Sequence, residues 1–413
     1  MASKIRILDE KTINQIAAGE VIESPASVVK ELVDNAIDAR ATKIVVEAVN
    51  SGRQLIRVQD NGCGMGHDDA LLCIERHATS KIRSLDDLWA LATMGFRGEA
   101  LSSVASISEF SLLTAPQNAS SDQSEGSLLQ VNGGKIISHE KVKCLSGTTI
   151  EVKSLFYNVP ARKKFLKSPA KDAGDIVKVL LQTALANPQV AFELVLNHKR
   201  EFSWQAASLE DRVKDALGNE FFSELIAVSF QKDDIRIHGF VANPSFSRPT
   251  RAYQYLFVNN RPVVSLPLSQ AVKEAYGSSL DPVRHPAFVL FIDIATTALD
   301  VNVHPQKKEV RISFEDELKQ ALIQGVSSAL FSRNSSVSAI RPSFQSAKNY
   351  AASEPVPSAS FPAVPREFTQ KAIRELENNV YNEPAVPQFT QLFLEETAHS
   401  VNVQAVFDDF IIC

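Results

Sequence analysis

Three polar residues near the start of the chain could together bind a cation and activate a water molecule. Glu31, Asn35 and Asp38 are separated by four and three residues. A helix turns by about 100° per residue, so these positions share one face of a helix. A carboxylate can take a proton from water, and carboxylate and amide oxygens are the ligands that Mg²⁺ prefers. Because a solvated helix face often has the same composition, this set needs support from other stretches.

The helix itself is predicted by its capping residues and its apolar spacing. Ser24 suits the N-cap position and Pro25 suits the first turn. Apolar residues then recur at helical spacing and give the helix a back that can be buried. They are Val28, Val29, Leu32, Val33, Ala36 and Ile37. The face that carries Glu31 and Asn35 is therefore expected to point away from the core.

A second stretch that could bind a ligand follows a predicted hairpin, whose strands are residues 44–49 and 55–58. Asp60 would stand at the end of the second strand and supply a hydrogen-bond acceptor. Gly62 and Gly64 follow it and allow the backbone to approach a ligand closely. Asp-Asn-Gly is also a common turn sequence, and this second interpretation stays open for the stretch taken alone.

Two later stretches favour a nucleotide site. In Gly95–Ala100, backbone N–H groups ahead of an expected helix would form an anion site, and the glycines are typical of a mobile lid. In Gly147–Ile150, Thr148 would lie where a strand leaves a glycine turn. No P-loop pattern occurs in the 413 residues, so a phosphate would have to be bound in another way.

The composition is that of a soluble globular protein, with 44% apolar and 22% charged residues. The sequence contains no apolar run of about 20 residues and no signal-peptide pattern, which predicts a cytoplasmic protein without a membrane role. The four cysteines lack metal-ligand spacing and are expected to be reduced thiols.

The formal net charge of −5 is unevenly distributed along the chain. Residues 341–413 hold 5 basic and 9 acidic residues, which leaves 38 and 39 in the rest of the chain. DNA binding would therefore need a local basic patch. Arg162, Lys163 and Lys164 lie in a basic stretch and could bind DNA phosphates. A solvated loop is the alternative interpretation of that stretch.

The periodicity of the sequence divides the chain into four parts. Strand and helix patterns alternate within residues 1–200 and again within 201–331, so we expect two α/β domains joined by a bridging helix. Residues 332–400 are predicted to form a flexible, disordered linker, because Ser, Pro, Ala and Asn dominate most of it. Residues 401–413 become apolar again and are expected to begin a further domain.

The four polar and glycine-containing stretches, in this order, resemble the GHKL ATPase family. Type II topoisomerases, heat-shock chaperones of the ninety-kilodalton class, sensor histidine kinases and MutL mismatch-repair proteins share that ATPase. Within the family, the lid stretch and three further motifs resemble MutL, and the resemblance covers roughly residues 3–331. The three motifs are Phe156–Leu166, Phe257–Val263 and Asp300–Arg311. The resemblance implies a Bergerat-type α/β sandwich followed by a smaller α/β domain similar to ribosomal proteins.

The resemblance also implies a role for each candidate residue. Glu31 would be the general base, Asn35 a Mg²⁺ ligand, and Asp60 the acceptor for the adenine amino group. Lys307 would reach from the second domain to the γ-phosphate. The remaining residues expected to line ATP are Gly64, Thr79, Lys81, Gly95, Phe96, Arg97, Gly98, Glu99, Ala100, Leu101 and Thr148.

As a MutL-like protein, the chain is expected to be a weak, Mg²⁺-dependent ATPase that forms a homodimer through its N-terminal region when ATP binds. It would bind DNA and couple mismatch recognition by MutS to a downstream nuclease or helicase. An endonuclease motif of the Asp-Gln-His-Ala type is absent from the sequence. Because its end resembles only the first strand of the MutL C-terminal dimerisation domain, we expect a truncated chain. The alternatives are a DNA-binding scaffold without turnover and a chaperone-type ATPase, which the MutL-like motifs disfavour.

Three positions depart from the MutL pattern. Arg40 replaces a glycine just past the site, where it should alter only the end of the helix. Asn260 replaces the glycine of a Val-Asn-Gly-Arg turn, which can survive because Asn also tolerates left-handed angles. Val264-Ser265 stands where relatives often have Arg-Asp, so a basic DNA contact is missing there, which weakens the assignment of any individual residue, Arg261 included, as a DNA contact.

Overall fold

The computed structural model describes Gly19 and residues 22–81, 98–117, 124–295, 299–300, 311–312, 315–337, 405–407 and 410–412. The first unit is built on an eight-stranded mixed sheet with the strand order β5-β4-β3-β6-β2-β1-β7-β8. Its strands are β1 (Lys43–Val49), β2 (Leu55–Asp60), β3 (Glu109–Ala115), β4 (Ser124–Asn132), β5 (Lys135–Cys144), β6 (Gly147–Lys153), β7 (Ala191–Leu196) and β8 (Lys199–Trp204). Only the β1–β7 pair of this sheet is parallel.

The helices of the first unit are α2 (Pro25–Asp38), α3 (His67–Leu72), α4 (Ala100–Ser106), α5 (Pro160–Lys164) and α6 (Pro169–Ala186). The predicted start of α2 is confirmed: the Ser24 hydroxyl accepts a hydrogen bond from the Ser27 N–H at 3.3 Å, and Pro25 is the first helical residue. Arg40, just beyond the helix, has a φ of 60°, so it takes the left-handed position that glycine favours. Helix α2 therefore ends in a backbone conformation that a glycine at position 40 could also adopt.

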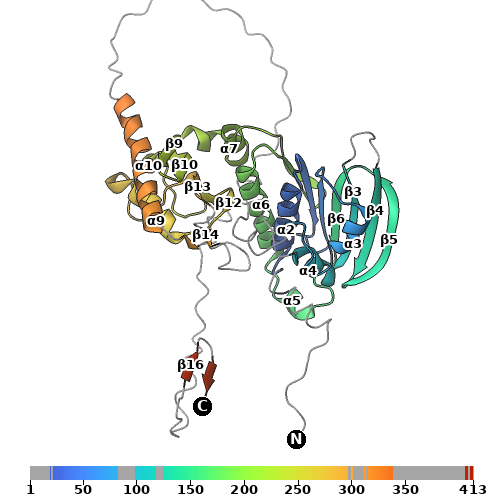
Figure 1. Ribbon diagram of the computed structural model, residues 1–413. Coiled ribbons are helices and arrows are strands. Elements are labelled where there is room, and N and C mark those ends of the chain that lie inside the picture. Colours follow the sequence, from blue (N-terminus) through green and yellow to red (C-terminus); the bar gives the residue numbers. More distant parts are fainter. Residues whose placement is uncertain are drawn as a thin grey trace, which may run out of the picture.

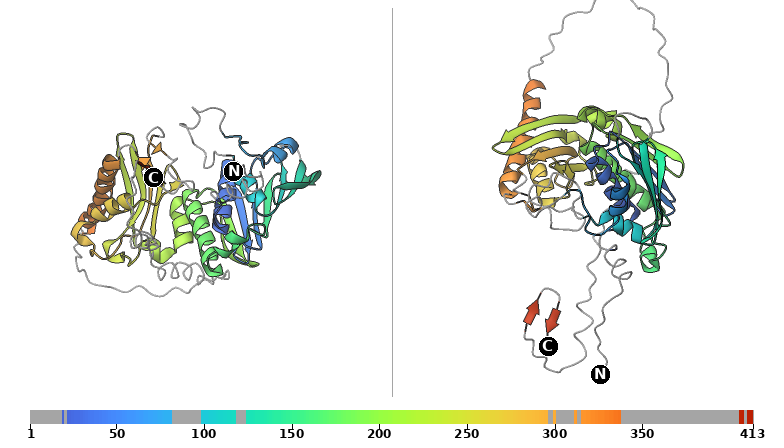
Figure 2. Two further views of the ribbon diagram at one scale, coloured as in Figure 1. Left: turned by 90° about the horizontal axis from the view of Figure 1, so that it is seen from below. Right: turned by 45° about the vertical axis from the view of Figure 1, so that its right-hand side comes forward.

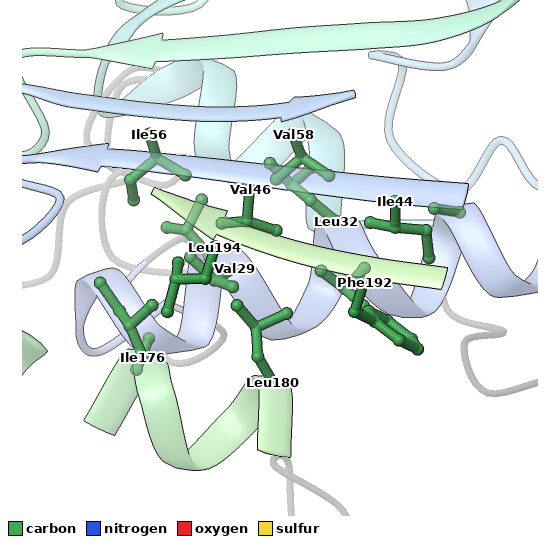
Figure 3. Close-up of a cluster of buried hydrophobic side chains, with 14 of the residues drawn as sticks. Val29, Leu32, Ile44, Val46, Ile56, Val58, Ile176, Leu180, Phe192 and Leu194 are labelled. Atoms are coloured by element: carbon green, nitrogen blue, oxygen red, sulfur yellow. The ribbon is translucent and has the colours of Figure 1, made fainter. Parts of the chain in front are cut away.

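The core of the first unit lies between the sheet and the helices α2 and α6 (Figure 3). Val29 and Leu32 of α2 face the sheet, and Ile176 and Leu180 of α6 pack beside them. All of these side chains are almost completely buried. Burial of one such side chain contributes about 1.5–3 kcal/mol, so the apolar stripe predicted for α2 is what holds its polar face in place.

The second unit is a five-stranded mixed sheet with the order β12-β11-β13-β10-β9. Its strands are β9 (Leu225–Lys232), β10 (Ile235–Ala242), β11 (Gln254–Val258), β12 (Arg261–Pro262) and β13 (Phe288–Asp293). Its helices are α7 (Leu209–Leu217), α8 (Asn219–Ser223), α9 (Leu266–Glu274) and α10 (Glu315–Val337), with short 3₁₀ turns η2 (Pro244–Phe246) and η3 (Gly277–Ser279). The turn between β11 and β12 forms with Asn at position 260, as expected. Asn259 and Asn260 adopt the left-handed φ angles of 47° and 62°.

The two units share a hydrophobic core through the second sheet. Tyr255 and Phe257 of β11 belong to the same buried cluster as α2 and α6, whereas the alternate residues Leu256 and Val258 pack in a cluster with α9 and α10. Because side chains alternate across a strand, each face of this sheet is covered by a different set of helices. Helix α6 therefore bridges the units, as expected, and it lies between the two sheets in Figures 1 and 2.

Two predicted boundaries shift in the structure. The boundary at residue 200 falls inside β8, which pairs with β7, so the first sheet extends to Trp204. Helix α10 continues to Val337, past the expected start of the linker at residue 332. The strand pairs β14 (Leu299–Asp300) with β15 (Arg311–Ile312) and β16 (Ala405–Phe407) with β17 (Phe410–Ile412) complete the structure. In the described ranges, no helix is long and apolar enough to cross a membrane.

Candidate nucleotide-binding site

The polar face of α2 binds a cation from another segment of the chain. Asn35 Oδ1 accepts a hydrogen bond from the Lys81 ammonium at 2.9 Å, and Asp38 Oδ2 lies 2.5 Å from the same nitrogen. Glu31 lies on this face one turn before Asn35 and is half-buried. Its carboxylate makes no hydrogen bond with the described part of the chain. The oxygen-bearing side chains of Glu31, Asn35 and Asp38 therefore lie on one face of α2, and two of them bind the same ammonium group.

A second acceptor lies at the end of β2, in the middle of the sheet. Asp60 Oδ1 accepts the Gly62 N–H at 2.8 Å, and Asp60 pairs directly with Thr148 of β6. Burial raises the pKa of Asp60, and the backbone N–H groups of Gly62 and Thr148 oppose this shift. The Asp60 side chain is thus half-buried and is oriented by backbone N–H groups.

Thr114, which our sequence interpretation did not select, connects the segments around Asp60. Its buried hydroxyl donates to the Gly147 carbonyl at 3.0 Å and accepts the Met65 N–H at 3.0 Å. Since its only proton goes to Gly147, the Thr148 hydroxyl at 3.1 Å is the donor to Thr114. The one signal in the sequence was a polar residue at the position where the alternation of Phe110 and Leu112 predicts an inward-facing side chain.

The structure gives a reason for two of the predicted glycines. Gly64 has a φ of 63°, and a Cβ there would collide with the carbonyl of Ala115. Gly98 has a φ of 61°, and a Cβ there would collide with the carbonyl of Ala78. Both positions thus require a residue without a side chain, as expected for backbone that comes close to its neighbours.

The segment before the lid and the end of the lid lie side by side. The Thr79 hydroxyl accepts the Lys81 N–H at 3.2 Å, and Glu99 contacts His77 at 3.3 Å. Ala100 and Leu101 begin α4. Of the remaining predicted residues, Gly95, Phe96, Arg97 and Lys307 lie outside the described residues.

The four candidate DNA-binding residues have different environments. Arg162 is half-buried and donates to the Ile22 carbonyl at 2.9 Å, and Arg261 of β12 is half-buried beside α2. Burial lowers the pKa of Arg261, and the charges of Asp34 and Asp38 oppose that shift. These two arginines are bound within the protein. Lys163 and Lys164 are exposed at the end of α5, and DNA binding by all four stays a prediction.

Two family models match the chain. Residues 22–160 match the model of the histidine kinase-, DNA gyrase B- and HSP90-like ATPase. This range includes α2, Asp60 and Thr148. Residues 213–331 match the model of the C-terminal domain of DNA mismatch repair protein. The two matches fall on the two structural units, in the order that the resemblance implies.

Curated relatives match about four fifths of this chain. The chain is 46% identical over 329 residues to DNA mismatch repair protein MutL of Symbiobacterium thermophilum, covering 79% of this chain and 51% of that protein. It is 44% identical over 330 residues to MutL of a Geobacter species, covering 80% of this chain and 50% of that protein. The chain thus spans about half the length of these curated relatives.

Solved structures show the same fold. The N-terminal domain of a DNA repair protein superposes with a TM-score of 0.66 at 26% identity, covering 79% of this chain and 99% of that chain. The ATPase domain of Aquifex aeolicus MutL, complexed with ADP, superposes with a TM-score of 0.50 at 26% identity, covering 73% of this chain and 98% of that chain. The fold, the order of the two matched units and the similar sequences agree, and the chain belongs to the MutL family of GHKL-type ATPases.

Proposed function

We propose that this chain binds and slowly hydrolyses ATP with Mg²⁺, and that ATP binding drives its N-terminal dimerisation in DNA mismatch repair. The observation that carries the proposal is the polar face of α2. Two of its oxygen-bearing residues, Asn35 and Asp38, bind a cation, and the Glu31 carboxylate lies one turn away. A cation-binding surface next to a carboxylate is what hydrolysis of a phosphate anhydride requires.

Each residue has a task in this proposal. Glu31 would orient and deprotonate the water that attacks the γ-phosphate. Asp60, within reach of Thr148 and the Gly64 turn, would accept a hydrogen bond from the adenine amino group. These two ends of the site lie on α2 and β2, which the common core holds together. The ADP in the Aquifex aeolicus MutL structure supports a nucleotide as the ligand.

The residues present fit Mg²⁺ as the metal. Asn35 and Asp38 offer oxygen atoms and already hold an ammonium group. In the described part of the chain, no group of three or more His, Cys, Asp or Glu residues could hold a metal ion by itself. Mg²⁺ needs no such group, because it keeps several waters and shares its coordination with phosphate oxygens. When bound with ATP, it would neutralise charge on the phosphates.

Family membership supports a role in DNA mismatch repair. We propose that the chain contacts DNA, a MutS-type mismatch recognition protein and a downstream nuclease or helicase, and that it acts in the cytoplasm as an ATP-dependent homodimer. The exposed Lys163 and Lys164 are candidates for contacts with DNA phosphates.

Three measurements on the purified chain test the proposal. Titration calorimetry should detect ATP binding that depends on Mg²⁺, and a phosphate-release assay should detect slow turnover. Sedimentation velocity at micromolar protein should give a monomer without nucleotide or with ADP, and a dimer with a non-hydrolysable ATP analogue. Binding without phosphate release would favour the scaffold instead, and a stable dimer without nucleotide would contradict ATP-driven assembly.

A further inference from the structure

Lys81 is held by α2 although it belongs to a distant part of the sequence. Its ammonium contacts Asn35 Oδ1 at 2.9 Å and Asp38 Oδ2 at 2.5 Å. The side chain of Lys81 is 19% exposed and that of Asp38 is 10% exposed, so the pair is largely removed from water. A charged pair that is removed from water is stable only if its atoms are close and hydrogen-bonded. Both Lys81 contacts have hydrogen-bond distances.

A neighbouring pair on the same helix provides a comparison. Lys30 contacts Asp34 at 2.7 Å, one turn before Asp38, and both residues belong to α2 at the i and i+4 positions. That pair is similarly buried, with side chains 25% and 11% exposed, but it joins two neighbouring turns of one helix. Lys81, by contrast, is 46 residues from Asn35 in sequence and binds an amide oxygen in addition to a carboxylate. Its ammonium therefore occupies the oxygen that our proposed function assigns to a metal.

An ammonium and a divalent ion cannot share this oxygen at low energetic cost. Mg²⁺ would lie about 2.1 Å from Asn35 Oδ1, and the Lys81 nitrogen lies 2.9 Å from the same atom. Two positive charges would then be only a few ångströms apart in a partly buried site, where their repulsion is strong. Binding of a divalent ion at Asn35 therefore requires Lys81 to move away.

We propose that Lys81 is a resident cation of the metal site, which occupies Asn35 and Asp38 in the nucleotide-free chain and leaves Asn35 when a divalent ion binds. This inference rests on the proposed function, since it takes Asn35 as the metal ligand. In this exchange, the metal takes the Asn35 oxygen that the ammonium gives up. The released ammonium becomes available to an anionic group, and a phosphate of the incoming nucleotide is the group that arrives with the metal.

When Lys81 moves away, the carboxylate of Asp38 still has a positive charge nearby. Arg261, on β12 of the second unit, faces Asp34 and Asp38, whose charges act on its guanidinium. Strand β12 also contacts α6, the helix that bridges the two units. Arg261 of the second unit thus keeps a positive charge near Asp38. This charge lowers the free-energy cost of moving the Lys81 ammonium away.

Metal binding to the full chain without nucleotide tests the exchange. Mn²⁺, titrated by electron paramagnetic resonance, serves as the divalent probe. Lys81→Met should bind Mn²⁺ more tightly than the parent by about 3- to 30-fold, because a competing charge is removed. Lys81→Arg keeps the positive charge and should resemble the parent. Lys30→Met is the matched control, since it removes the lysine of the neighbouring pair, and it should leave Mn²⁺ binding unchanged.

The proposal would be overturned if the parent and Lys81→Met bound Mn²⁺ equally well. It would also be overturned if Lys81→Met had a native circular dichroism spectrum but did not bind Mn²⁺. A second measurement uses only the parent chain. Acetylation by acetic anhydride, followed by mass spectrometry of peptides, should show Lys81 becoming more reactive relative to Lys30 when Mg²⁺ alone is added. No change in that ratio would also count against the exchange.

These tests are separate from those of the proposed function, because they contain no nucleotide. A chain that shows the exchange but does not hydrolyse ATP would contradict the proposed ATPase activity and leave the role of Lys81 intact. If the chain hydrolyses ATP but its Mg²⁺ affinity does not depend on Lys81, the ATPase proposal stands and the exchange is overturned.

Discussion

Asp60 and Thr148 are directly paired across β2 and β6, so an acceptor and a hydroxyl from distant parts of the sequence meet at the end of the same strand pair. The Thr148 hydroxyl is held by Thr114, and the Asp60 carboxylate is held by the Gly62 N–H. Both side chains are therefore oriented before any ligand arrives, which reduces the entropy that a ligand must lose on binding.

Asp60→Ala should weaken ATP binding by about 1–3 kcal/mol, because a buried donor of the ligand would lose its partner. Titration calorimetry with parent and variant measures the difference. Asp68→Ala removes an exposed carboxylate on α3 and serves as the control. Unchanged affinity in Asp60→Ala would exclude a contact between Asp60 and the nucleotide.

The same residue should give a pH dependence of stability. The folded chain raises the pKa of Asp60 above the ordinary value, mainly through burial. The stabilising contribution of Asp60 is therefore fully present below the unfolded pKa of about 4 and is lost as the pH rises through the higher folded pKa. Asp60→Asn, which cannot ionise, should gain stability relative to the parent across this window. Urea unfolding at several pH values measures it, and a constant difference would contradict the expectation.

Glu31→Ala should leave ATP binding largely intact and slow hydrolysis by roughly 10²- to 10⁴-fold, the usual contribution of a positioned general base. Phosphate release measures turnover, and calorimetry measures binding. Glu23→Ala, which removes an exposed carboxylate just before α2, should change neither. Comparable turnover in Glu31→Ala and the parent would rule out this role.

Thr114→Val should destabilise the chain by about 1–3 kcal/mol and also weaken ATP binding, because the buried polar groups of Gly147 and Met65 would lose their partner. Thr114→Ser keeps the hydroxyl and should restore most of the binding. If Val and Ser variants bind ATP equally well, the hydroxyl does not organise the site.

Arg40→Gly should stabilise the chain by about 0.5–1 kcal/mol, since a non-glycine residue in the left-handed region is strained. The hydrogen bonds at this helix end need that conformation: the Arg40 N–H donates to Ile37, and the Ala41 N–H donates to Ala36. Urea unfolding midpoints measure the gain. Arg40→Ala retains the strain and should show none; an equal gain in both variants would point to the charge of Arg40 instead.

Lys163→Ala combined with Lys164→Ala should reduce the slope of log affinity against log salt by about 2 for duplex DNA, since each lost phosphate contact changes that slope by about 0.9. Fluorescence anisotropy over a salt series gives the slope. Lys167→Ala is the control, because Lys167 already pairs with Asp175 at 2.9 Å. An unchanged slope in the double variant would remove this patch from the DNA interface.

Some features of the site follow from the sequence alone because their causes are local. The cap and apolar stripe of α2 depend on residues within a few turns of one another, and the left-handed turn at Asn260 depends on the preference of one residue type. Strand β8 was not predicted, since its pattern is short and carries charged residues at its start. In the structure it pairs with β7, and Trp204 lies opposite Phe192.

The contacts that give the site its charge distribution were decided only by the tertiary structure. Lys81 reaches Asn35 across 46 residues of sequence, and Arg162 reaches Ile22 across 140. Arg261, a candidate DNA contact, lies close enough to Asp34 and Asp38 of α2 for their charges to act on it. Backbone preferences and capping act within a few residues, whereas these partners meet because the order of the strands and the shared core around α6 bring their segments together. The sequence therefore determined which residues could do the chemistry, and the packing of the two units determined which charges surround them.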